Sequence, residues 1–415
     1  MRRPKARPWP RERHRMKRVL FLGAAHFQIP AIEYARQAGY YVLTCDTRPD
    51  SPGHRLAHEA HNVSTVDQMG ILEVARSRSI DGILSFGSDV SALTAAVVAR
   101  DLGLPGACAE TVEILTRKSL FRQFLSNNGL QQQRYGVFRR DNVEAAASFA
   151  RHFGVSAVIK PVDSSGSKGV SVVHGAADID AALAYAFSES RSGEVIIEEY
   201  IGKSGMQVCG DGYMDQAKLA FIELGDGHFH DNDGLLAPFA ETFPSTHFKA
   251  SLDLLTRKVE SILVAAGYRK GPFNLDAIIT CDGEPFIIEI GPRSGGNFIP
   301  TAIRHQTGVD LIAAAVEGCL DQGFTLDTTK ARSERLFASY MLHSRSGGTF
   351  RDMHIDPAFA GHIVEENLYL KRGAKVRPFR TASDVIGNLI LSFSSLPEMQ
   401  DRIANFGPYC WPEVE

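Results

Sequence analysis

The residues of this chain most able to do chemistry are two carboxylates and an arginine within residues 273–297. Asp276 ends or closely follows one short apolar run, and Glu289 ends the next, after a turn at an Asp-Gly pair. Strands joined by such a turn are neighbours, so the pattern predicts that the two carboxylates lie close together. Paired carboxylates suit Mg²⁺, which prefers hard oxygen ligands, and Arg293 could neutralise charge on a transferring phosphoryl group. A hairpin with solvated or salt-bridged carboxylates is the alternative interpretation.

A second segment, residues 157–173, has two β-branched runs around a loop of serine, glycine and lysine. Small residues let backbone N–H groups approach an anion closely. Lys160 lies within the first apolar run, where a lone ammonium would be costly to bury. The Walker pattern is absent, so the segment predicts a flexible flap over phosphates, with an ordinary glycine-rich hairpin as the alternative. The loop residues are Ser165, Gly166, Ser167 and Lys168.

Together with two further motifs, these segments resemble the ATP-grasp enzymes, in the branch similar to carbamoyl-phosphate synthetase and the biotin carboxylases. The resemblance covers about residues 18–325 and rests on elements in the family's order. These elements are Lys118 in Thr-Arg-Lys-Ser-Leu-Phe-Arg, Lys160 with its Ser/Gly loop, Glu198-Glu199-Tyr200-Ile201, Asp276, and Glu289 with Arg293.

The resemblance implies where ATP binds. Lys118 and Lys160 would hold its phosphates, and the loop of residues 165–168 would close over them. The segment of residues 198–201 would be the interdomain hinge, which pairs with adenine through the Glu199 carbonyl and the Ile201 N–H. The family tends to place an acidic residue after the hinge to hold the ribose, and this chain has none there. We considered Asp211 and Gln207 as substitutes.

The resemblance also implies the chemistry of the acidic pair. Asp276 and Glu289 would bind magnesium, and Arg293 would stabilise the transferred phosphoryl group, with Lys160 as the second catalytic cation. Members of the family usually have the motif Glu-x-Asn-x-Arg, whereas this chain has glycine, Gly291, in place of the asparagine. A ligand for the second metal ion is therefore missing, or is replaced by water or by Asn297.

The sequence predicts an α/β ATP-grasp fold. Residues 18–46 alternate strand, helix and strand, which predicts an N-terminal parallel sheet. Residues 23–27 do not match Gly-x-Gly-x-x-Gly, so a dinucleotide fingerprint is absent. With Asp46 and residues 85–89, they follow strand ends and are expected to line a crevice. The predicted parts are a disordered basic tail (1–17), an N-terminal α/β or pre-ATP-grasp domain (18–112), an ATP-grasp domain (113–325, flap about 153–202) and a C-terminal α+β appendage (326–415).

Two long helices are expected over residues 111–127 and 302–319. Residues 225–247 differ from their surroundings, because histidines and acids stand there among Gly, Pro and Phe. These residues are His228, His230, Asp231, Asp233, Glu241 and His247. Their spacing follows no regular helix or strand, which favours a substrate-facing loop over a transition-metal site.

Composition sets further limits. The 45 Lys and Arg nearly balance 48 Asp and Glu, so nothing indicates a nucleic-acid partner. The six cysteines are far apart and form no Cys-x-x-Cys pair, which predicts buried thiols in a reducing, cytoplasmic compartment. No apolar run reaches the ~18 residues of a membrane span, so no membrane partner is expected. The basic start could be a targeting arm, but a disordered tail or a true start at Met16 is favoured.

We therefore expect a nucleotide-binding and metal-binding ligase that depends on ATP and Mg²⁺. It would activate a small carboxylate as an acyl phosphate, join it to an amine and release ADP. Enzymes catalyse such phosphoryl transfer mainly by positioning the reactants and neutralising their charge. Its partners would be these small substrates and a second copy in a homodimer. The alternatives are a small-molecule kinase on the same scaffold and a nucleotide-binding protein that has lost catalysis, the latter supported only by Gly291.

Overall fold

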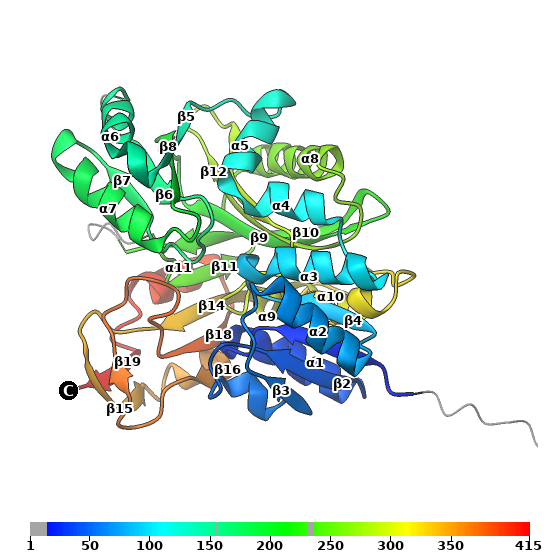
Figure 1. Ribbon diagram of the computed structural model, residues 1–415. Helices are drawn as coiled ribbons and strands as arrows, with labels where there is room; N and C mark the ends of the chain where they lie inside the picture. The colour runs from blue at the N-terminus through cyan, green and yellow to red at the C-terminus, as the bar shows by residue number, and fades with distance from the viewer. Residues whose placement is uncertain (1–14, 154–155, 231–235) are drawn as a thin grey trace, which may run out of the picture.

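The computed structural model describes residues 15–153, 156–230 and 236–415, which form three lobes around a central sheet (Figure 1). The N-terminal elements form the blue lobe, residues 135–199 form the green lobe at the upper left, and the C-terminal strands form the orange and red lobe. Most of the predicted tail of residues 1–17 lies outside the described residues. Among the described residues, no helix is long and apolar enough to cross a bilayer.

The N-terminal lobe is a parallel sheet with the strand order β3-β2-β1-β4, which confirms the βαβ prediction. Its elements are β1 (Arg18–Leu22), β2 (Tyr41–Cys45), β3 (Glu59–His61), β4 (Gly82–Ser85), α1 (Ile29–Gln37), α2 (Gln68–Arg78) and α3 (Asp89–Leu102). Helices cover both faces of this sheet. Consecutive residues such as Val19 and Leu20, which face opposite sides of it, are therefore both fully buried. One face packs against α10 (Leu311–Leu320), which comes from much later in the chain.

The prediction of two long helices is wrong, because the structure divides each of them into two shorter helices. Residues 111–127 contain the end of α4 (Ala109–Thr116) and α5 (Lys118–Asn127), because Arg117 between them has extended backbone angles, φ −94° and ψ 108°. Residues 302–319 are divided between α9 (Ile299–Thr307) and α10, and Gly308 between them has φ +73°. The break at Arg117 makes Lys118 the first residue of α5.

The flap is an antiparallel sheet with the order β5-β8-β6-β7, covered by two helices. Its elements are β5 (Tyr135–Arg139), α6 (Val143–Arg151), β6 (Ala157–Pro161), β7 (Ser171–Val173), α7 (Ile179–Glu189) and β8 (Glu194–Glu199). Alanines and branched aliphatic residues fill the space between sheet and helices, including Ala146, Ile159 and Leu183. The flap therefore has a hydrophobic core of its own.

An eight-stranded sheet with the order β13-β12-β9-β10-β11-β14-β18-β16 joins the β12–β13 hairpin, which carries Asp276 and Glu289, to the C-terminal lobe. Its strands are β9 (Gln207–Asp215), β10 (Lys218–His228), β11 (Ala240–Phe243), β12 (Gly271–Ile279), β13 (Pro285–Gly291), β14 (Leu336–Leu342), β16 (Ile363–Leu368) and β18 (Gly387–Phe393). The remaining elements are α8 (Lys249–Ala265), α11 (Leu396–Ala404), β15 (Gly348–Ile355), β17 (Lys375–Val376) and β19 (Cys410–Val414). The C-terminal strands thus extend the central sheet through the β11–β14 pair.

Candidate functional site

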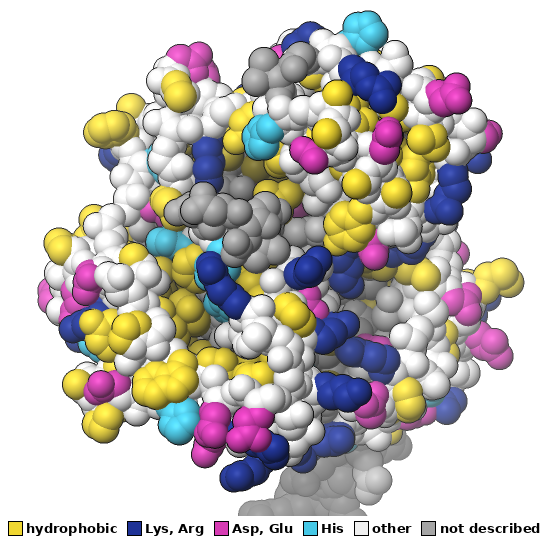
Figure 2. Space-filling view, turned by 90° about the vertical axis from the view of Figure 1, so that its left-hand side faces the viewer, with side chains coloured by type: hydrophobic (Ala, Val, Ile, Leu, Met, Phe, Trp, Pro, Cys, Tyr) yellow, Lys and Arg dark blue, Asp and Glu magenta, His cyan; other side chains and the backbone are white. Residues whose placement is uncertain are grey.

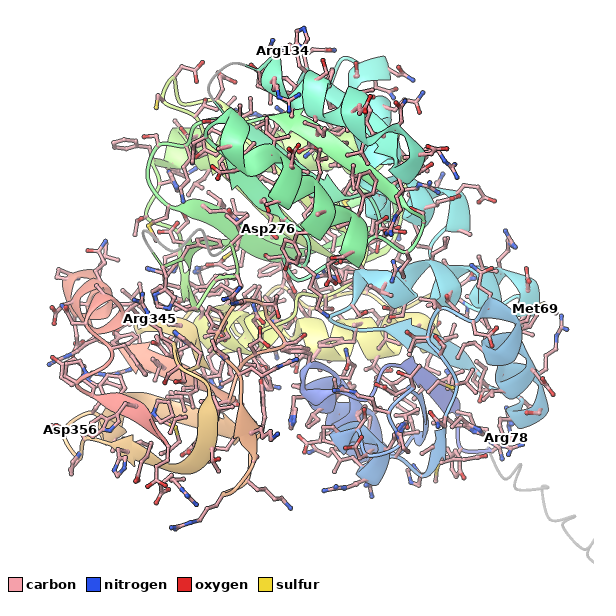
Figure 3. All side chains as sticks on the ribbon, turned by 60° about the vertical axis from the view of Figure 1, so that its left-hand side comes forward. Met69, Arg78, Arg134, Asp276, Arg345 and Asp356 are labelled. Atoms are coloured by element: carbon pink, nitrogen blue, oxygen red, sulfur yellow. The ribbon has the colours of Figure 1, made fainter. Side chains whose placement is uncertain are left out.

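Asp276 and Glu289 are cross-strand partners in the β12–β13 hairpin, as the sequence predicted. Asp276 lies in the middle of β12 and not at its end, and Gln207 Nε2 donates a hydrogen bond of 2.9 Å to its Oδ1 atom. Burial and the neighbouring Glu289 raise the pKa of Asp276, and Asp89 adds to the shift. Figure 3 shows Asp276 near the centre of the molecule, where the lobes meet.

The two lysines expected to bind phosphate come from separate elements, and one of them, Lys118, lies beside this hairpin. Lys118 Nζ, at the start of α5, lies 3.8 Å from Glu289 Oε2 and donates a hydrogen bond of 2.7 Å to Ser164 O in the flap loop. Lys160 on β6 is buried, and burial lowers its pKa although the Glu198 carboxylate opposes the shift. A poorly solvated cation needs an anion, which Glu198 supplies here and to which phosphate oxygens would add.

The Glu198 carboxylate lies between two cations. Its Oε2 atom is 2.6 Å from Lys160 Nζ, and its Oε1 atom accepts a hydrogen bond of 2.9 Å from Arg122 Nε. Burial alone would raise the pKa of Glu198, but Arg122 and Lys160 together lower it to about 2. The side chain of this expected hinge residue therefore orients the lysine.

The rest of the predicted hinge lies at the C-terminal end of β8, an interior strand of the flap sheet. The Glu199 carbonyl, which the resemblance assigns to adenine, accepts a hydrogen bond of 3.2 Å from Gln133 Nε2, and the Glu199 carboxylate pairs with Arg134. Tyr200 is 39% exposed and Ile201 is partly buried. This segment lies beside the strand of Lys160, because β8, which ends at Glu199, pairs with β6.

The flap loop has the backbone that an anion-binding loop requires. Gly166 and Ser167 both have positive φ angles, +66° and +61°, and Ser167 Oγ donates a hydrogen bond of 2.7 Å to Leu236 O. Ser165 and Lys168 are partly exposed in the same loop. On the face seen in Figure 2, Lys and Arg side chains gather in the middle, beside the grey atoms.

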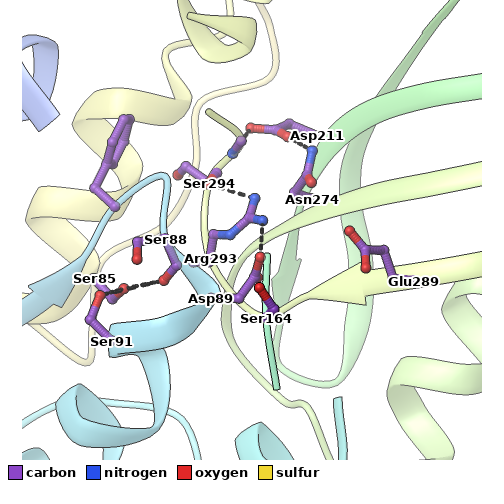
Figure 4. Close-up of polar contacts among 12 residues, drawn as sticks. Ser85, Ser88, Asp89, Ser91, Ser164, Asp211, Asn274, Glu289, Arg293 and Ser294 are labelled. Atoms are coloured by element: carbon purple, nitrogen blue, oxygen red, sulfur yellow. Dashed lines mark hydrogen bonds and ion pairs between the residues drawn. The ribbon is translucent and has the colours of Figure 1, made fainter. Parts of the chain in front are cut away.

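Arg293 is buried and ion-paired with a residue of the N-terminal lobe. Its Nη2 atom lies 2.5 Å from Asp89 Oδ2, and its Nη1 atom donates a hydrogen bond of 3.1 Å to Ser294 O (Figure 4). Asp89 is the first residue of α3, where the helix dipole favours a negative charge. The sequence placed Asp89 in the predicted crevice without indicating its partner.

Gly291 leaves room for this ion pair. A Cβ atom at position 291 would lie 2.5 Å from Asp89 Oδ1 and 3.1 Å from Arg293 Cζ. Asn297, one substitute considered for the missing metal ligand, instead donates a hydrogen bond of 3.2 Å to Glu241 Oε1. The space of the family's asparagine is therefore taken by Asp89.

Two further buried carboxylates stand around the hairpin. Asp211 accepts hydrogen bonds from Gly295 N at 2.6 Å and from Asn274 Nδ2 at 2.8 Å, so it fixes the loop after Arg293 and is not placed to hold a ribose. Glu241 on β11 is 4% exposed, and its Oε2 atom has no hydrogen-bond partner among the described residues. Burial raises the pKa of Glu241 well above its usual range.

The histidines of residues 225–247 are dispersed. His228 Nε2 lies 3.0 Å from Thr242 Oγ1, and His230 Nε2 lies 2.7 Å from His343 Nε2. Asp231 and Asp233 lie outside the described residues. Within the part of the chain that the structure describes, no three His, Cys, Asp or Glu side chains form a complete metal centre. Mg²⁺ fits the hairpin nevertheless, because it is usually held by one or two carboxylates together with phosphate oxygens.

Comparison with known proteins agrees with this arrangement. A family model described as an ATP-grasp domain matches residues 153–302. The formate-dependent phosphoribosylglycinamide formyltransferase of Burkholderia lata is 30% identical over 314 residues, which cover 72% of this chain and 75% of that protein. The protein of the same name from Burkholderia vietnamiensis is 30% identical over 191 residues, which cover 44% of this chain and 46% of that protein, about half of its length.

Among solved structures, an L-amino acid ligase from Bacillus licheniformis superposes with a TM-score of 0.81 at 18% identity, over 97% of this chain and 99% of that one. This similarity shows the fold, and the relative from Burkholderia lata shows the family. The predicted fold class and resemblance are thereby confirmed. The chain belongs to the ATP-grasp family, whose enzymes use ATP with Mg²⁺.

Proposed function

We propose that the chain is a ligase that phosphorylates a small carboxylate with ATP and joins the resulting acyl phosphate to an amine. The observation that carries this proposal is that Lys118 lies 3.8 Å from Glu289, the cross-strand partner of Asp276. Lys160 lies close enough to Lys118 for the two charges to interact, and the charge of the buried Arg293 likewise acts on Glu289. The names of the relatives, a formate-dependent formyltransferase and an L-amino acid ligase, support the same class of reaction.

Each site residue has a separate role in the proposed reaction. Lys118 and Lys160 bind phosphate oxygens of ATP, and the flap loop excludes water from above. Asp276 and Glu289 would hold Mg²⁺, which would supply further neutralisation of the phosphate charge. Arg293 donates its N–H groups to the phosphoryl group while it moves between oxygens. An oxygen of the substrate carboxylate attacks the γ-phosphorus, ADP leaves, and the amine then displaces phosphate from the carbonyl carbon.

The Glu241 carboxyl supports an amine as the second substrate. It is buried, one of its oxygens has no partner in the described part of the chain, and it lies beside Asn297 near the metal hairpin. A buried carboxyl oxygen that lacks a partner gains most from a ligand that donates hydrogen bonds, such as an ammonium or amide group. We infer that Glu241 orients the nitrogen-bearing substrate.

The proposal is tested by measuring ADP release from Mg-ATP. One arm supplies formate with phosphoribosylglycinamide, and the other supplies pairs of L-amino acids, because the two relatives differ in this respect. Turnover that requires both a carboxylate and an amine supports the ligase, whereas ADP release without an amine indicates the kinase alternative. Release of AMP would contradict the acyl phosphate route.

We further propose the domain limits given above, a homodimer and a cytoplasmic location. The six cysteines form no disulfide, which supports a reducing compartment. Cys45, Cys209, Cys319 and Cys410 are buried as predicted, whereas that prediction is wrong for Cys108 and Cys281, which are exposed. Light scattering after size-exclusion chromatography tests the homodimer, since a mass near 45 kDa would mean a monomer.

A further inference from the structure

We propose that the cavity between the N-terminal lobe and the central sheet is a regulatory binding site for an amino acid with a large apolar side chain. The volume of this cavity is about 650 Å³, which is a usual size for a ligand pocket. Neither Asp276 nor Glu289 lines it, so the site is separate from the carboxylates of the β12–β13 hairpin. The proposal therefore goes beyond the proposed function, and the choice of substrates does not affect it.

Part of the cavity wall is apolar. Four buried alanines of α3 line it, and their spacing of i, i+3, i+4 and i+7 places them on one face of the helix; they are Ala92, Ala95, Ala96 and Ala99. Ile83 and Leu84 of β4 and Ala315 of α10 continue this wall. Because alanine side chains are short, they leave room beside the helix, which the apolar side chain of a ligand would fill.

Another part of the lining carries two oxygen atoms that need a hydrogen-bond donor or acceptor. Tyr213 is fully buried, and neither its hydroxyl nor Asp215 Oδ1 has a hydrogen-bond partner within the described chain. Both residues line the cavity, and they are two positions apart on β9, so their side chains face the same side of the sheet. The Tyr213 hydroxyl is directed at Gly318, another lining residue, where an added Cβ atom would lie 2.7 Å from it. A ligand that donates hydrogen bonds would satisfy both oxygens.

The charges near these oxygens indicate the polar groups of the ligand. Lys270 Nζ lies 3.5 Å from Asp215 Oδ1, but its hydrogen bonds of 2.6 Å and 2.5 Å go to the carbonyl oxygens of Gln322 and Phe324. Arg269, the next residue of the lining, is exposed. Two cations beside one carboxylate leave a surplus of positive charge, which an anionic group would offset. An α-amino acid combines an ammonium group for Asp215 with a carboxylate for Arg269.

The cavity extends from the surface to the arginine of the proposed active site. Gln216 and Gln322 in its lining are exposed, whereas Arg293 in the same lining is buried. Arg293 is ion-paired with Asp89, which begins the helix that forms the apolar wall. A ligand in the cavity would therefore contact both the arginine and the helix that this ion pair joins. We expect it to change turnover without competing with ATP.

The test measures binding of L-phenylalanine to the full chain by calorimetry, with ADP and Mg²⁺ present to fill the nucleotide site. Phenethylamine and 3-phenylpropanoate, which each lack one of the two charged groups, should bind about tenfold more weakly or worse. Saturating L-phenylalanine should change the kcat for ADP release by about twofold or more, with the KM for ATP unchanged.

Two variants test the oxygens of the lining. Tyr213→Phe removes only the hydroxyl, and we expect it to weaken L-phenylalanine binding about threefold to tenfold. Its melting temperature should be unchanged or higher, because that hydroxyl has no partner within the described chain. Asp215→Asn should weaken binding about tenfold or more, because the ammonium group loses its counter-charge. Tyr268→Phe is the matched control: Tyr268 also lines the cavity, but its hydroxyl already donates a hydrogen bond of 2.7 Å to Pro272 O. This variant should have a lower melting temperature and nearly the affinity of the wild type.

The opposite results would overturn the proposal. L-phenylalanine affinity that is equal in the wild type, Tyr213→Phe and Asp215→Asn would mean that the amino acid binds elsewhere, for example as a substrate beside the hairpin. Binding of phenethylamine or 3-phenylpropanoate as tight as that of L-phenylalanine would overturn the ligand class. No binding of L-phenylalanine to the wild type would overturn the site, and turnover that does not respond to bound L-phenylalanine would overturn its regulatory role.

Discussion

Lys160 and Glu198 face each other across strands β6 and β8, with 2.6 Å between Nζ and Oε2, and both side chains are almost completely buried. A buried pair of this kind gives little net stability, because desolvation offsets most of the attraction. Its value here is orientation, since Glu198 is also fixed by Arg122. The lysine that the sequence assigned to ATP is thus held in one rotamer before ATP binds, which reduces the entropy lost on binding.

Glu198 predicts how stability depends on pH. Its pKa is lowered from the usual 4.5 to about 2, so its contribution to stability is complete above pH ~4.5 and is lost as the pH falls toward 2. The size of that loss is roughly 3 kcal/mol. Urea unfolding at successive pH values should show it in the wild type. In Glu198→Gln the decline over this interval should be shallower, and stability at pH 7 should fall by about 3–5 kcal/mol, because two buried cations lose their anion. Parallel curves for the two proteins would contradict the assignment.

Lys160→Met should abolish most nucleotide binding without unfolding the chain. Methionine keeps the length of the side chain, and Glu198 keeps Arg122 as a partner. We expect ATP affinity by calorimetry to fall tenfold or more, as for the loss of a charge-assisted phosphate contact worth ~1.5–3 kcal/mol. Lys218→Met, at an exposed position of β10, is the control and should bind ATP normally. Equal affinities in both variants would remove Lys160 from the phosphate site.

Arg293→Lys should lower turnover about 100-fold with ATP affinity nearly unchanged. Lysine retains the charge but lacks the planar fork, which here contacts Asp89 and Ser294 O through different nitrogens. Steady-state kinetics and ATP binding, measured on the same preparation, separate the two effects. Arg304→Lys on α9, whose guanidinium is partly exposed, should behave as the wild type. Full activity in Arg293→Lys would mean that the arginine acts only as a distant charge.

Two adjacent glycines after Arg293 should differ in tolerance. A Cβ atom at Gly295 would lie 2.6 Å from Asp211 Oδ1, whereas at Gly296 the nearest atom, Gly87 O, is 3.9 Å away. Gly295→Ala should therefore lower the free energy of unfolding by about 1–3 kcal/mol, and Gly296→Ala should change it by less than ~0.5 kcal/mol. Denaturant titrations give both values. Similar losses would show that Asp211 shifts easily and does not hold the loop.

Local patterns in the sequence predicted the elements that depend on neighbouring residues. The β12–β13 hairpin and the βαβ unit follow from strand propensity and turn residues, so the approach of Asp276 and Glu289 was predictable. The break at Gly308 has a signal in the sequence, since glycine is common after a helix end. The break at Arg117 had none, because only its tertiary setting makes that residue extended.

Contacts between segments that are distant in the chain could not be predicted from one sequence. Asp89 and Gly291 belong to different lobes, and no pattern in a single chain shows that the carboxylate of one fills the space left by the other. The same holds for Glu198, whose family role concerns the backbone and whose side chain turned out to fix Lys160. The eight-stranded central sheet was not predicted either, because the β11–β14 pairing joins strands that are almost 100 residues apart in the chain.

That pairing has a consequence for the newly made chain. The strand β11 can be covered only after β14 has been synthesised, so a chain stopped near residue 325 would display β11 as an open edge, at the opposite end of the sheet from the β12–β13 hairpin. Exposed edges pair with other chains and promote aggregation. A chain that lacked β14 would therefore be expected to aggregate through β11 instead of acting as a shorter enzyme.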